Sequence, residues 1–338
     1  MTGLEYWLPI TWSILIAVAV LMYVVMDGFD LGMGILFPFA PDDQSRDLMM
    51  NSVAPVWDGN ETWLVLGGGG LLAAFPVAYA TILPALYIPI IVMLLSLAFR
   101  GVAFEFRSKA SPANRWVWDI AFAGGSTLAT LMQGVTLGAF IQGFAVENER
   151  FVGDTFDWLS GFSILTGFAL VAGYGLLGAT WVIVKTEGDL QRWAYDRTVA
   201  LLAVVTVFLA AVSLWTPFLE NTINERWFSW PNIGYLSVVP ILTALVILRI
   251  RRTVQRRYEI QPFVLSIGLF LLSYLGLGIS VYPNVVPPDV TIWEAASHTS
   301  SLQFMLVGVL ILLPIILAYT AYTYWVFRGK VRPGEGYH

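Results

Sequence analysis

The chain has 338 residues, of which 57% are hydrophobic and only 12% are charged, and its mean hydropathy is +0.72. A soluble domain is typically about one quarter charged, so this composition excludes an ordinary soluble protein and predicts a polytopic membrane protein. The chain contains no cysteine, which excludes disulfides, zinc–cysteine sites and iron–sulfur ligation, and its two histidines, His298 and His338, are too few for haem ligation by several histidines. The net charge of -5 carries little information, because the placement of basic residues between spans matters more than their sum.

Apolar stretches long enough to cross a bilayer, which requires about 20 residues, follow one another along the whole chain. The first stretch lacks a basic segment before it and a small-residue cleavage site after it, so we expect a retained span and not a signal peptide. Phe75 and Pro76 divide the long apolar block from Ala54 to Arg100 into two spans. We therefore predict an all-α integral membrane protein with one polytopic domain over residues 1–338 and nine transmembrane helices, near residues 8–38, 54–75, 77–100, 117–144, 159–184, 197–219, 229–249, 260–281 and 301–327.

Basic residues are distributed very unequally between the two faces that these nine spans define. Arg150 and Arg226 fall on the face of the N-terminus, and the other 16 of the 18 Lys and Arg residues fall at the opposite face. The basic face is cytoplasmic by the positive-inside rule, so we expect the N-terminus outside and the C-terminus in the cytoplasm. The 16 residues are Arg46, Arg100, Arg107, Lys109, Arg115, Lys185, Arg192, Arg197, Arg249, Arg251, Arg252, Arg256, Arg257, Arg328, Lys330 and Arg332.

Acidic residues interrupt or adjoin the first three spans near their cytoplasmic ends. Asp27 and Asp30 occur in MDGFDLGMG, Asp58 and Glu61 in WDGNETW, and Glu105 in FRGVAFEFRSK. Both pairs have i, i+3 spacing, which puts their members on one helix face. Since spans joined by short connections are usually neighbours, these groups could form one cluster.

Two interpretations of Asp58 and Glu61 follow from the residues. An acid followed three residues later by Glu resembles a capping box at a helix start. A helix that started at Asp58 and ended before Pro76 would be short for a membrane core, which favours a start near Asn51 or Ser52. Asp58 would then lie inside the membrane boundary, where an ionisable group is a candidate for a proton relay.

The other charged groups have structural alternatives. Asp27 and Asp30 could simply lie at the cytoplasmic interface, although Gly28 beside them favours tight packing. Arg100 and Glu105 could form a structural ion pair at a span end, with Arg107 extending towards the interface as an anchor.

Three further features have a simple structural interpretation. We expect the glycines of Gly67–Gly70 to allow close helix contact, and His298 to be a loop residue and not a ligand. The arginine-rich segment from Arg249 to Arg257 is typical of a topology determinant that faces anionic lipid.

Five strings, in this order, resemble subunit II of the cytochrome bd-type quinol oxidases, including their cyanide-insensitive branch. They are DGFDLG, APVWDGNETWL, AFRGVAFEFRSK, TIWEAASHTSSLQF and PIILAYTAYTYW, and together they extend from Asp27 to Trp325. The stretch from about Lys185 to Pro240 carries no string of this kind, so no property is transferred there.

The resemblance implies a heterodimer in the bacterial cytoplasmic (inner) membrane, with two four-helix bundles plus one peripheral helix in this subunit. The partner, subunit I, would carry haem b and haem d and the quinol-oxidising site, where electrons from quinol reduce dioxygen to water and generate a proton motive force without pumping. This chain would bind no cofactor firmly, although a structural quinone, lipid and small single-span subunits could associate with it. No nucleic-acid partner is expected.

The resemblance also implies site residues. The Asp of the WDGN string, Asp58, would belong to a proton path from the cytoplasm that also passes Glu105. Some relatives have Gln at the position of Glu61 and Asp at the position of Glu105, so Glu61 is not expected to be an obligatory relay. The remaining members of the predicted site are Asp27 and Asp30, with a lesser role in hydration or packing, and Asn60, Trp57 and Arg100 as supporting residues.

Two other classes of function compete with this one. A proton-coupled secondary transporter also uses carboxylates within a multi-span bundle. Such folds often contain inverted repeats, whereas here the acids crowd spans 1 to 3 without a counterpart in spans 5 to 9. A pure scaffold for a haem-bearing partner is the third alternative.

Overall fold

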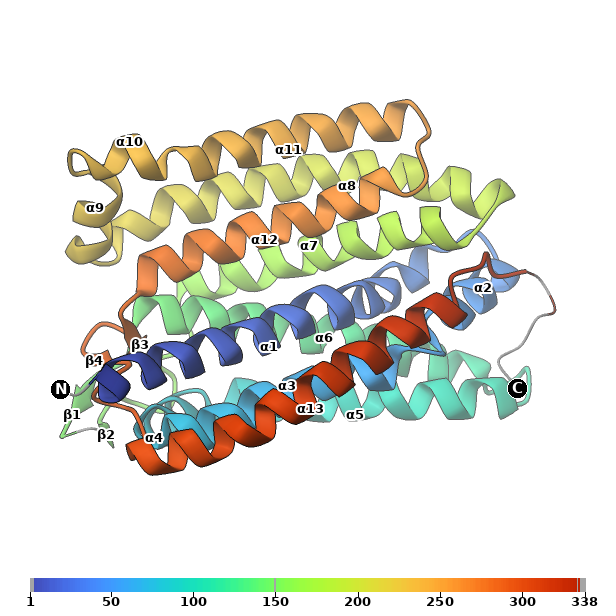
Figure 1. Ribbon diagram of the computed structural model, residues 1–338. Helices are drawn as coiled ribbons and strands as arrows, with labels where there is room; N and C mark the ends of the chain where they lie inside the picture. Colours follow the sequence, from blue (N-terminus) through green and yellow to red (C-terminus); the bar gives the residue numbers. More distant parts are fainter. Residues whose placement is uncertain (1–2, 149, 333, 335–338) are drawn as a thin grey trace.

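Long helices run side by side between two ends of the molecule in the computed structural model (Figure 1), which describes residues 3–148, 150–332 and 334. Helix α1 begins at the end of the molecule opposite to the one at which α13 ends. The α-helices are α1 (Gly3–Leu36), α2 (Asp43–Val53), α3 (Trp57–Ala74), α4 (Pro76–Ala85), α5 (Tyr87–Lys109), α6 (Arg115–Gln142), α7 (Gly161–Lys185), α8 (Gly188–Trp215), α9 (Asn221–Phe228), α10 (Asn232–Leu236), α11 (Val238–Gln255), α12 (Gln261–Val281) and α13 (Thr299–Val326).

Short elements close the end of the molecule where α1 begins. Strand β1 (Val146–Glu147) pairs with β2 (Arg150–Phe151), and β3 (Asn284–Val286) pairs with β4 (Val290–Thr291), both antiparallel. Helices α4, α9 and α10 lie at the same end (Figure 1). Two 3-10 helices, Phe37–Phe39 and Thr216–Phe218, follow α1 and α8 directly. This end therefore holds the longer connections, and the opposite end holds α2 and the tight turns.

Eight of the described helical segments are long and apolar enough to cross a membrane: α1 with its 3-10 extension, α5, α6, α7, α8, α10 with α11, α12 and α13. Helix α3 has 18 residues and runs alongside α1, but its first turns are polar. The prediction of an all-helical membrane protein is confirmed.

The predicted boundary of the third span was wrong. The apolar sequence after Pro76 forms α4, a helix of 10 residues that ends at Ala85, and the span itself is α5, which runs from Tyr87 to Lys109. The predicted end at Arg100 coincides with the first charged residue after the apolar run. The helix continues because Arg100 and Arg107 are both neutralised by carboxylates from other helices.

The start predicted for the second span was also wrong. Helix α2 ends at Val53 and a turn separates it from α3, which begins at Trp57 and not near Asn51 or Ser52. Pro55 lies in this turn, and a proline has no backbone N–H group to continue the hydrogen-bond ladder of α2.

Glycines bring the central helices into close contact. A Cβ atom added to Gly134 of α6 would lie 2.6 Å from the Cα atom of Gly167 in α7, and one added to Gly178 of α7 would lie 2.5 Å from the backbone of Gly32 in α1. Side chains larger than hydrogen do not fit at such crossings. Helices α1, α6 and α7 therefore form the tightly packed centre of the molecule.

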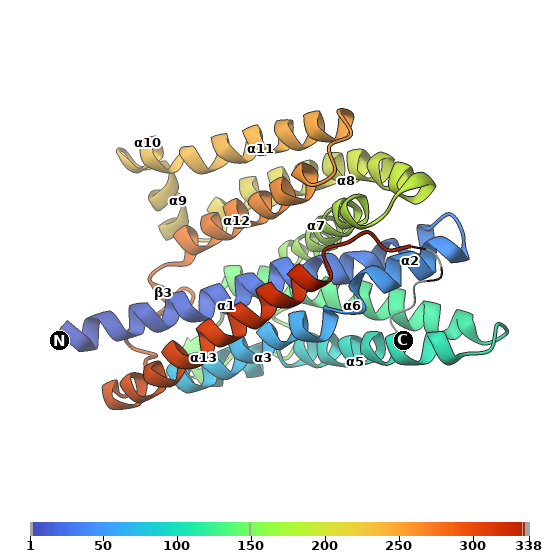
Figure 2. The same ribbon diagram turned by 45° about the vertical axis from the view of Figure 1, so that its right-hand side comes forward.

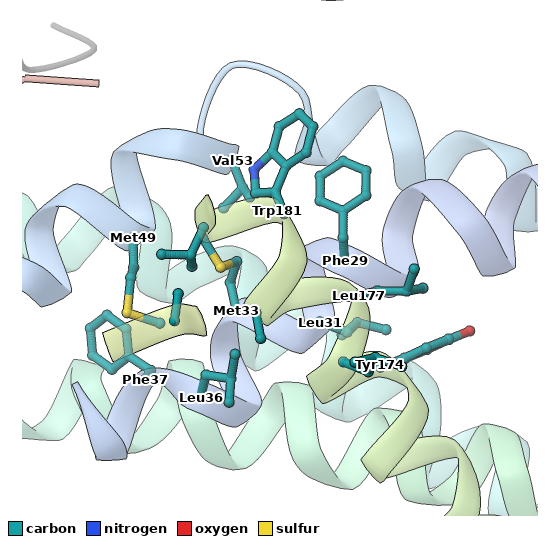
Figure 3. Packing of buried hydrophobic residues seen from close by; sticks show 14 of the residues in the cluster. Phe29, Leu31, Met33, Leu36, Phe37, Met49, Val53, Tyr174, Leu177 and Trp181 are labelled. Carbon is teal, nitrogen blue, oxygen red and sulfur yellow. The ribbon is translucent and has the colours of Figure 1, made fainter. Parts of the chain in front are cut away.

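The largest core cluster fills the space around this centre (Figure 3). Phe29 of α1 stacks on Trp181 of α7 with ring centroids 4.3 Å apart, and Leu31, Met33 and Leu177 are buried beside them. Aromatic pairs in this arrangement contribute about 0.5–1.5 kcal/mol beyond the burial of their area. The core lies at the level of Asp27 and Asp30, so it holds in place the segment of α1 that carries these acids.

Helices far from this centre are mostly exposed in the isolated chain. Within α13, whose residues are all described, Leu302 alone is buried. Helices α8, α11 and α12 form a group that is separated from α3 and α5 by the central helices (Figure 2). The apolar outer faces of these helices are suited to lipid or to another protein chain.

Candidate functional site

Three helices bring three acids, Asp27, Asp30 and Glu61, together around one arginine. Arg100 of α5 is completely buried, and its Nη1 donates to Oδ1 of Asp27 at 2.6 Å. Its Nη2 donates to Oε2 of Glu61 in α3 over a longer distance, 3.4 Å. Asp27 is fully buried, whereas the Glu61 side chain is 28% exposed. The arginine therefore binds one acid tightly in the interior and one loosely at its edge.

A second acid of α1 joins the group through an amide. Asn60 of α3 donates from Nδ2 to Oδ2 of Asp30 at 2.7 Å and to the Met26 carbonyl at 3.3 Å. Its Oδ1 accepts a hydrogen bond from the Tyr324 hydroxyl of α13 at 2.9 Å. The Met26 carbonyl and the Asp30 carboxylate fix the orientation of the amide, because they accept hydrogen bonds from Nδ2, whereas the tyrosine hydroxyl can donate to Oδ1. Asn60 thus links α1, α3 and α13.

Aromatic rings cover the arginine. Trp57 stacks on Phe104 with centroids 4.8 Å apart and rings tilted by 7°, and the Arg100 Cζ atom lies 5.8 Å from the Trp57 ring centroid. A guanidinium over an indole face is stabilised by the ring electrons. Trp57, Asn60 and Arg100, the predicted supporting residues, therefore all lie in or against the cluster.

Further polar groups extend the cluster on its inner side. The Tyr174 hydroxyl of α7 donates to Gln133 Oε1 at 3.0 Å, and Gln133 Nε2 donates to the Tyr23 hydroxyl at 2.5 Å. The Tyr23 side chain is also a neighbour of Asp27, which lies one turn further along α1. Sequence reasoning missed Tyr23, Gln133, Tyr174 and Tyr324. The available signal was a polar group in the middle of an apolar span, as at Gln133.

Several polar atoms of the cluster are buried and lack a hydrogen-bond partner among the described residues. They are Asp27 Oδ2, Asp30 Oδ1 and Arg100 Nε. An unpaired polar atom in the interior costs about 1–3 kcal/mol, and more when it is charged. The cluster is therefore a polar site within the core and not a fully satisfied structural network.

Asp58 lies beside the cluster and not within it. It is in the first turn of α3 and exposed, and the N-cap is Val56, with no side-chain capping bond, so the capping-box interpretation is wrong as well. The exposed position results from the late start of α3 after Pro55. Asp58 is close enough to Glu61, three residues along α3, for their charges to interact.

Glu105 is not part of the cluster. Its carboxylate pairs with Lys109 one turn along α5 at 3.3 Å, and both side chains are largely exposed. The expected ion pair between Arg100 and Glu105 does not form, because Asp27 and Glu61 occupy the guanidinium.

Arg107 does not extend to the interface as expected. It is buried and binds Asp119 and Asp47, each at 2.5 Å.

The structure also shows the surroundings of the glycines in α3 and of His298. Gly67 and Gly70 face Val20 and Ile16 of α1 at contact distance, as expected for close packing, whereas Gly68 and Gly69 face open space. His298 is the N-cap of α13, where its Nδ1 accepts from the Ser300 amide.

Among the residues that the structure describes, no group of three or more His, Cys, Asp or Glu side chains is arranged to hold a metal ion.

Comparisons with known proteins identify relatives over nearly the whole chain. The profile of the family described as "Cytochrome bd terminal oxidase subunit II" matches residues 8–327. Cytochrome bd-I ubiquinol oxidase subunit 2 of Escherichia coli (strain K12) is 31% identical, covering 95% of this chain and 94% of the relative. Cytochrome bd ubiquinol oxidase subunit 2 of Bacillus subtilis (strain 168) is 30% identical, with coverage of 96% and 97%.

A solved structure shares the fold. A chain of the bd oxidase from Geobacillus thermodenitrificans superposes with a TM-score of 0.76 at 16% sequence identity, covering 95% of this chain and 98% of that chain.

Proposed function

The chain belongs to the cytochrome bd terminal oxidase subunit II family, and on this premise we propose that it is the haem-free second subunit of a respiratory quinol oxidase in the bacterial inner membrane. In this proposal the chain stabilises a haem-bearing subunit I and supplies protons from the cytoplasm for the reduction of dioxygen to water. The relatives whose names include ubiquinol oxidase support the quinol substrate. The absence of cysteine and the presence of only two histidines support placing haem b and haem d in the partner.

The exposed face of α3 supports the proposal that a partner subunit binds there. Val65 and Leu72 are exposed there, Gly68 and Gly69 lie open, and Asp58 is at the start of the same helix. Lipid would cover the apolar side chains equally well, but it offers few hydrogen bonds to an acid at the membrane boundary and gains nothing from open glycines. A second protein chain satisfies both features, so we place subunit I against α3.

We further propose nine spans, with α3 as the ninth in addition to the eight apolar segments. The helices then divide into α1, α3, α5 and α6 in one four-helix bundle, α7, α8, α11 and α12 in a second, and α13 as the peripheral helix. The N-terminus lies outside and the C-terminus in the cytoplasm. The distribution of basic residues, 16 of 18 on the face of the C-terminus, supports this orientation.

The proton path begins at the cytoplasmic ends of α3 and α5. Glu105 and Asp58 are exposed in this chain on the side where α2 and the tight turns lie, so both are accessible to protons from the cytoplasm. Asp58 adjoins the face assigned to subunit I, and Glu61 lies one turn further into the membrane. The single observation that carries this proposal is an exposed ionisable side chain, Asp58, at the membrane boundary on a face that continues with apolar residues and glycine, such as Val65 and Gly68.

The test is oxygen consumption by the purified heterodimer with Asp58→Asn, which keeps the size and hydrogen-bonding groups of the side chain. We expect quinol oxidase activity to fall by about tenfold or more, as is usual when a proton-transfer group is removed, with unchanged haem spectra. The matched control is Asp196→Asn, which removes one acid from an exposed position on α8. Full activity of the Asp58 variant would refute the path and leave the scaffold alternative.

Co-purification separates the oxidase from the transporter. A reduced-minus-oxidised visible spectrum of material isolated through a C-terminal tag should contain the bands of haem b and haem d. A proton-coupled transporter would be isolated without haem, and that result would overturn the assignment to an oxidase complex.

A further inference from the structure

We propose that Asp27 and Asp30 form a closed acid pair that stores one exchangeable proton beside the proton path, and that Glu61 is the entry through which this proton is exchanged. The inference rests on the proposed function for its purpose, since a proton store is useful only beside a proton-consuming reaction. Its geometry depends on the contacts of Asp27, Asp30 and Glu61 with Arg100 and with the neighbouring amide groups. The inference gives Glu61 a role beyond the proposed path, namely the exchange of the stored proton.

The charges of the cluster do not balance. Three carboxylates, those of Asp27, Asp30 and Glu61, surround the single guanidinium of Arg100. Asp30 has no ion pair among the described residues, and its sole side-chain hydrogen bond comes from an uncharged amide. A fully buried carboxylate without a counter-charge is costly, so a proton on one of the two aspartates stabilises the group.

The orphaned atoms indicate where this proton resides. Asp27 Oδ2 and Asp30 Oδ1 are both buried acceptors without a donor, and the two residues are one helical turn apart on α1. An ionised carboxylate can only accept hydrogen bonds, whereas a protonated one also donates. A proton on either oxygen therefore adds a donor beside two acceptor atoms that have no hydrogen-bond partner among the described residues.

Amide groups close the pair on two sides. Asn60 separates Asp30 from Tyr324 of α13, and Gln133 separates Tyr23 from Tyr174 of α7. A side-chain amide has separate donor and acceptor atoms and is not an acid or base near neutral pH, so it holds a hydrogen bond without passing a proton along the chain. Neither series of hydrogen bonds therefore conducts a proton from the acid pair towards α13 or α7.

Glu61 lies on the partly exposed side of the cluster. It is the one member of the three acids that is partly exposed, and its distance of 3.4 Å from the guanidinium compares with 2.6 Å for Asp27. The side chain is thus free to move between Asp58 and the buried pair. A protonated Glu61 gives its proton to an oxygen of Asp27 or Asp30 and becomes the carboxylate that Arg100 retains; the reverse transfer releases the stored proton.

The experiment is infrared spectroscopy of the purified heterodimer in its lipid, with exchange from H₂O into D₂O. We expect a carbonyl-stretching band of a protonated, buried carboxyl group that is absent in the Asp30→Asn heterodimer. In the Glu61→Gln heterodimer the band should persist, with its exchange into D₂O slowed on the order of tenfold, since glutamine cannot transfer a proton. Glu225→Gln, at an exposed position on α9, is the matched control and should exchange at the wild-type rate.

Each outcome decides the inference. A wild-type heterodimer without a band that depends on Asp30 would refute the stored proton, and an unchanged exchange rate in Glu61→Gln would refute the entry. If Asp30→Asn does not assemble, the exchange rate of Glu61→Gln still tests the proposal. The failure of the proton path is distinguishable, because it is measured as full oxygen consumption by Asp58→Asn whether or not the stored proton exists.

Discussion

Two arginines of α5, seven residues apart, are both buried and both bound to two carboxylates, yet their surroundings differ. Arg100 binds Asp27 and Glu61 in a group that also contains Asp30. Arg107 binds Asp47 and Asp119, whose side chains are 46% and 21% exposed, and Arg115 lies 4.0 Å from Asp47. The first group has three acids and one base, and the second has two of each.

The difference separates a structural ion-pair network from a chemical site. Around Arg107 the charges are balanced and the carboxylates reach water, so the network fixes α2 and α6 against α5 without any need to exchange protons. Around Arg100 the two buried aspartates outnumber the single guanidinium, so one bound proton makes the buried part of the group neutral, while Glu61 is partly exposed. Burial and charge balance, and not the presence of an arginine with two acids, indicate function here.

The largest expected effect is that of Arg100→Met. This change leaves Asp27 buried without a counter-charge, and removal of one partner of a buried pair destabilises a protein by about 3–5 kcal/mol. We expect little assembled heterodimer, measured as haem-containing complex recovered from membranes. Wild-type yield and thermal stability would contradict the description of Arg100 as the sole cation of the cluster.

Arg107→Met should have a smaller effect. Asp47 can be hydrated at its exposed position, so the loss is confined to hydrogen bonds of a charged group, about 1.5–3 kcal/mol. We expect an assembled complex with a lower thermal midpoint and unchanged oxygen consumption per haem. An effect equal to that of Arg100→Met would remove the distinction between the two networks.

Glu105→Gln should change stability by about 0–1 kcal/mol, because its pair with Lys109 is exposed. Its effect on activity is the informative measurement. A decrease in oxygen consumption without any change in the thermal midpoint is expected if Glu105 belongs to the proton path. Wild-type activity would limit the path in this chain to Asp58.

The smallest effect concerns pH and the segment after α13. Lys330 and Gln191 donate to the Glu259 carboxylate, and these hydrogen bonds lower the pKa of Glu259 below its usual value. The stabilisation is therefore present above the pKa of glutamate in an unfolded chain and is lost as the pH falls through the lowered value. We expect proteolysis near Lys330 to increase in acid, and Glu259→Gln to abolish this dependence. Equal pH dependence in both proteins would contradict the contribution of this contact.

The sequence allowed the helical membrane fold, most of the spans and the acids of the cluster to be predicted. Long apolar runs determine spans directly, and i, i+3 spacing correctly grouped Asp27 with Asp30. The extension of α5 past Arg100 could not be predicted, because it depends on acids that lie 39 and 73 residues away in sequence. The same holds for Tyr324, which meets Asn60 across 264 residues.

The central claim is that protons enter through Asp58 of this chain. The most direct measurement is proton uptake on the cytoplasmic side, followed with a pH-sensitive dye after an oxygen pulse to reduced heterodimer in proteoliposomes of known orientation. Our account predicts that the rate of uptake in Asp58→Asn falls by about tenfold or more relative to the wild type and to Asp196→Asn at equal haem content. Uptake at the wild-type rate in Asp58→Asn would contradict it and would place the path in the partner subunit.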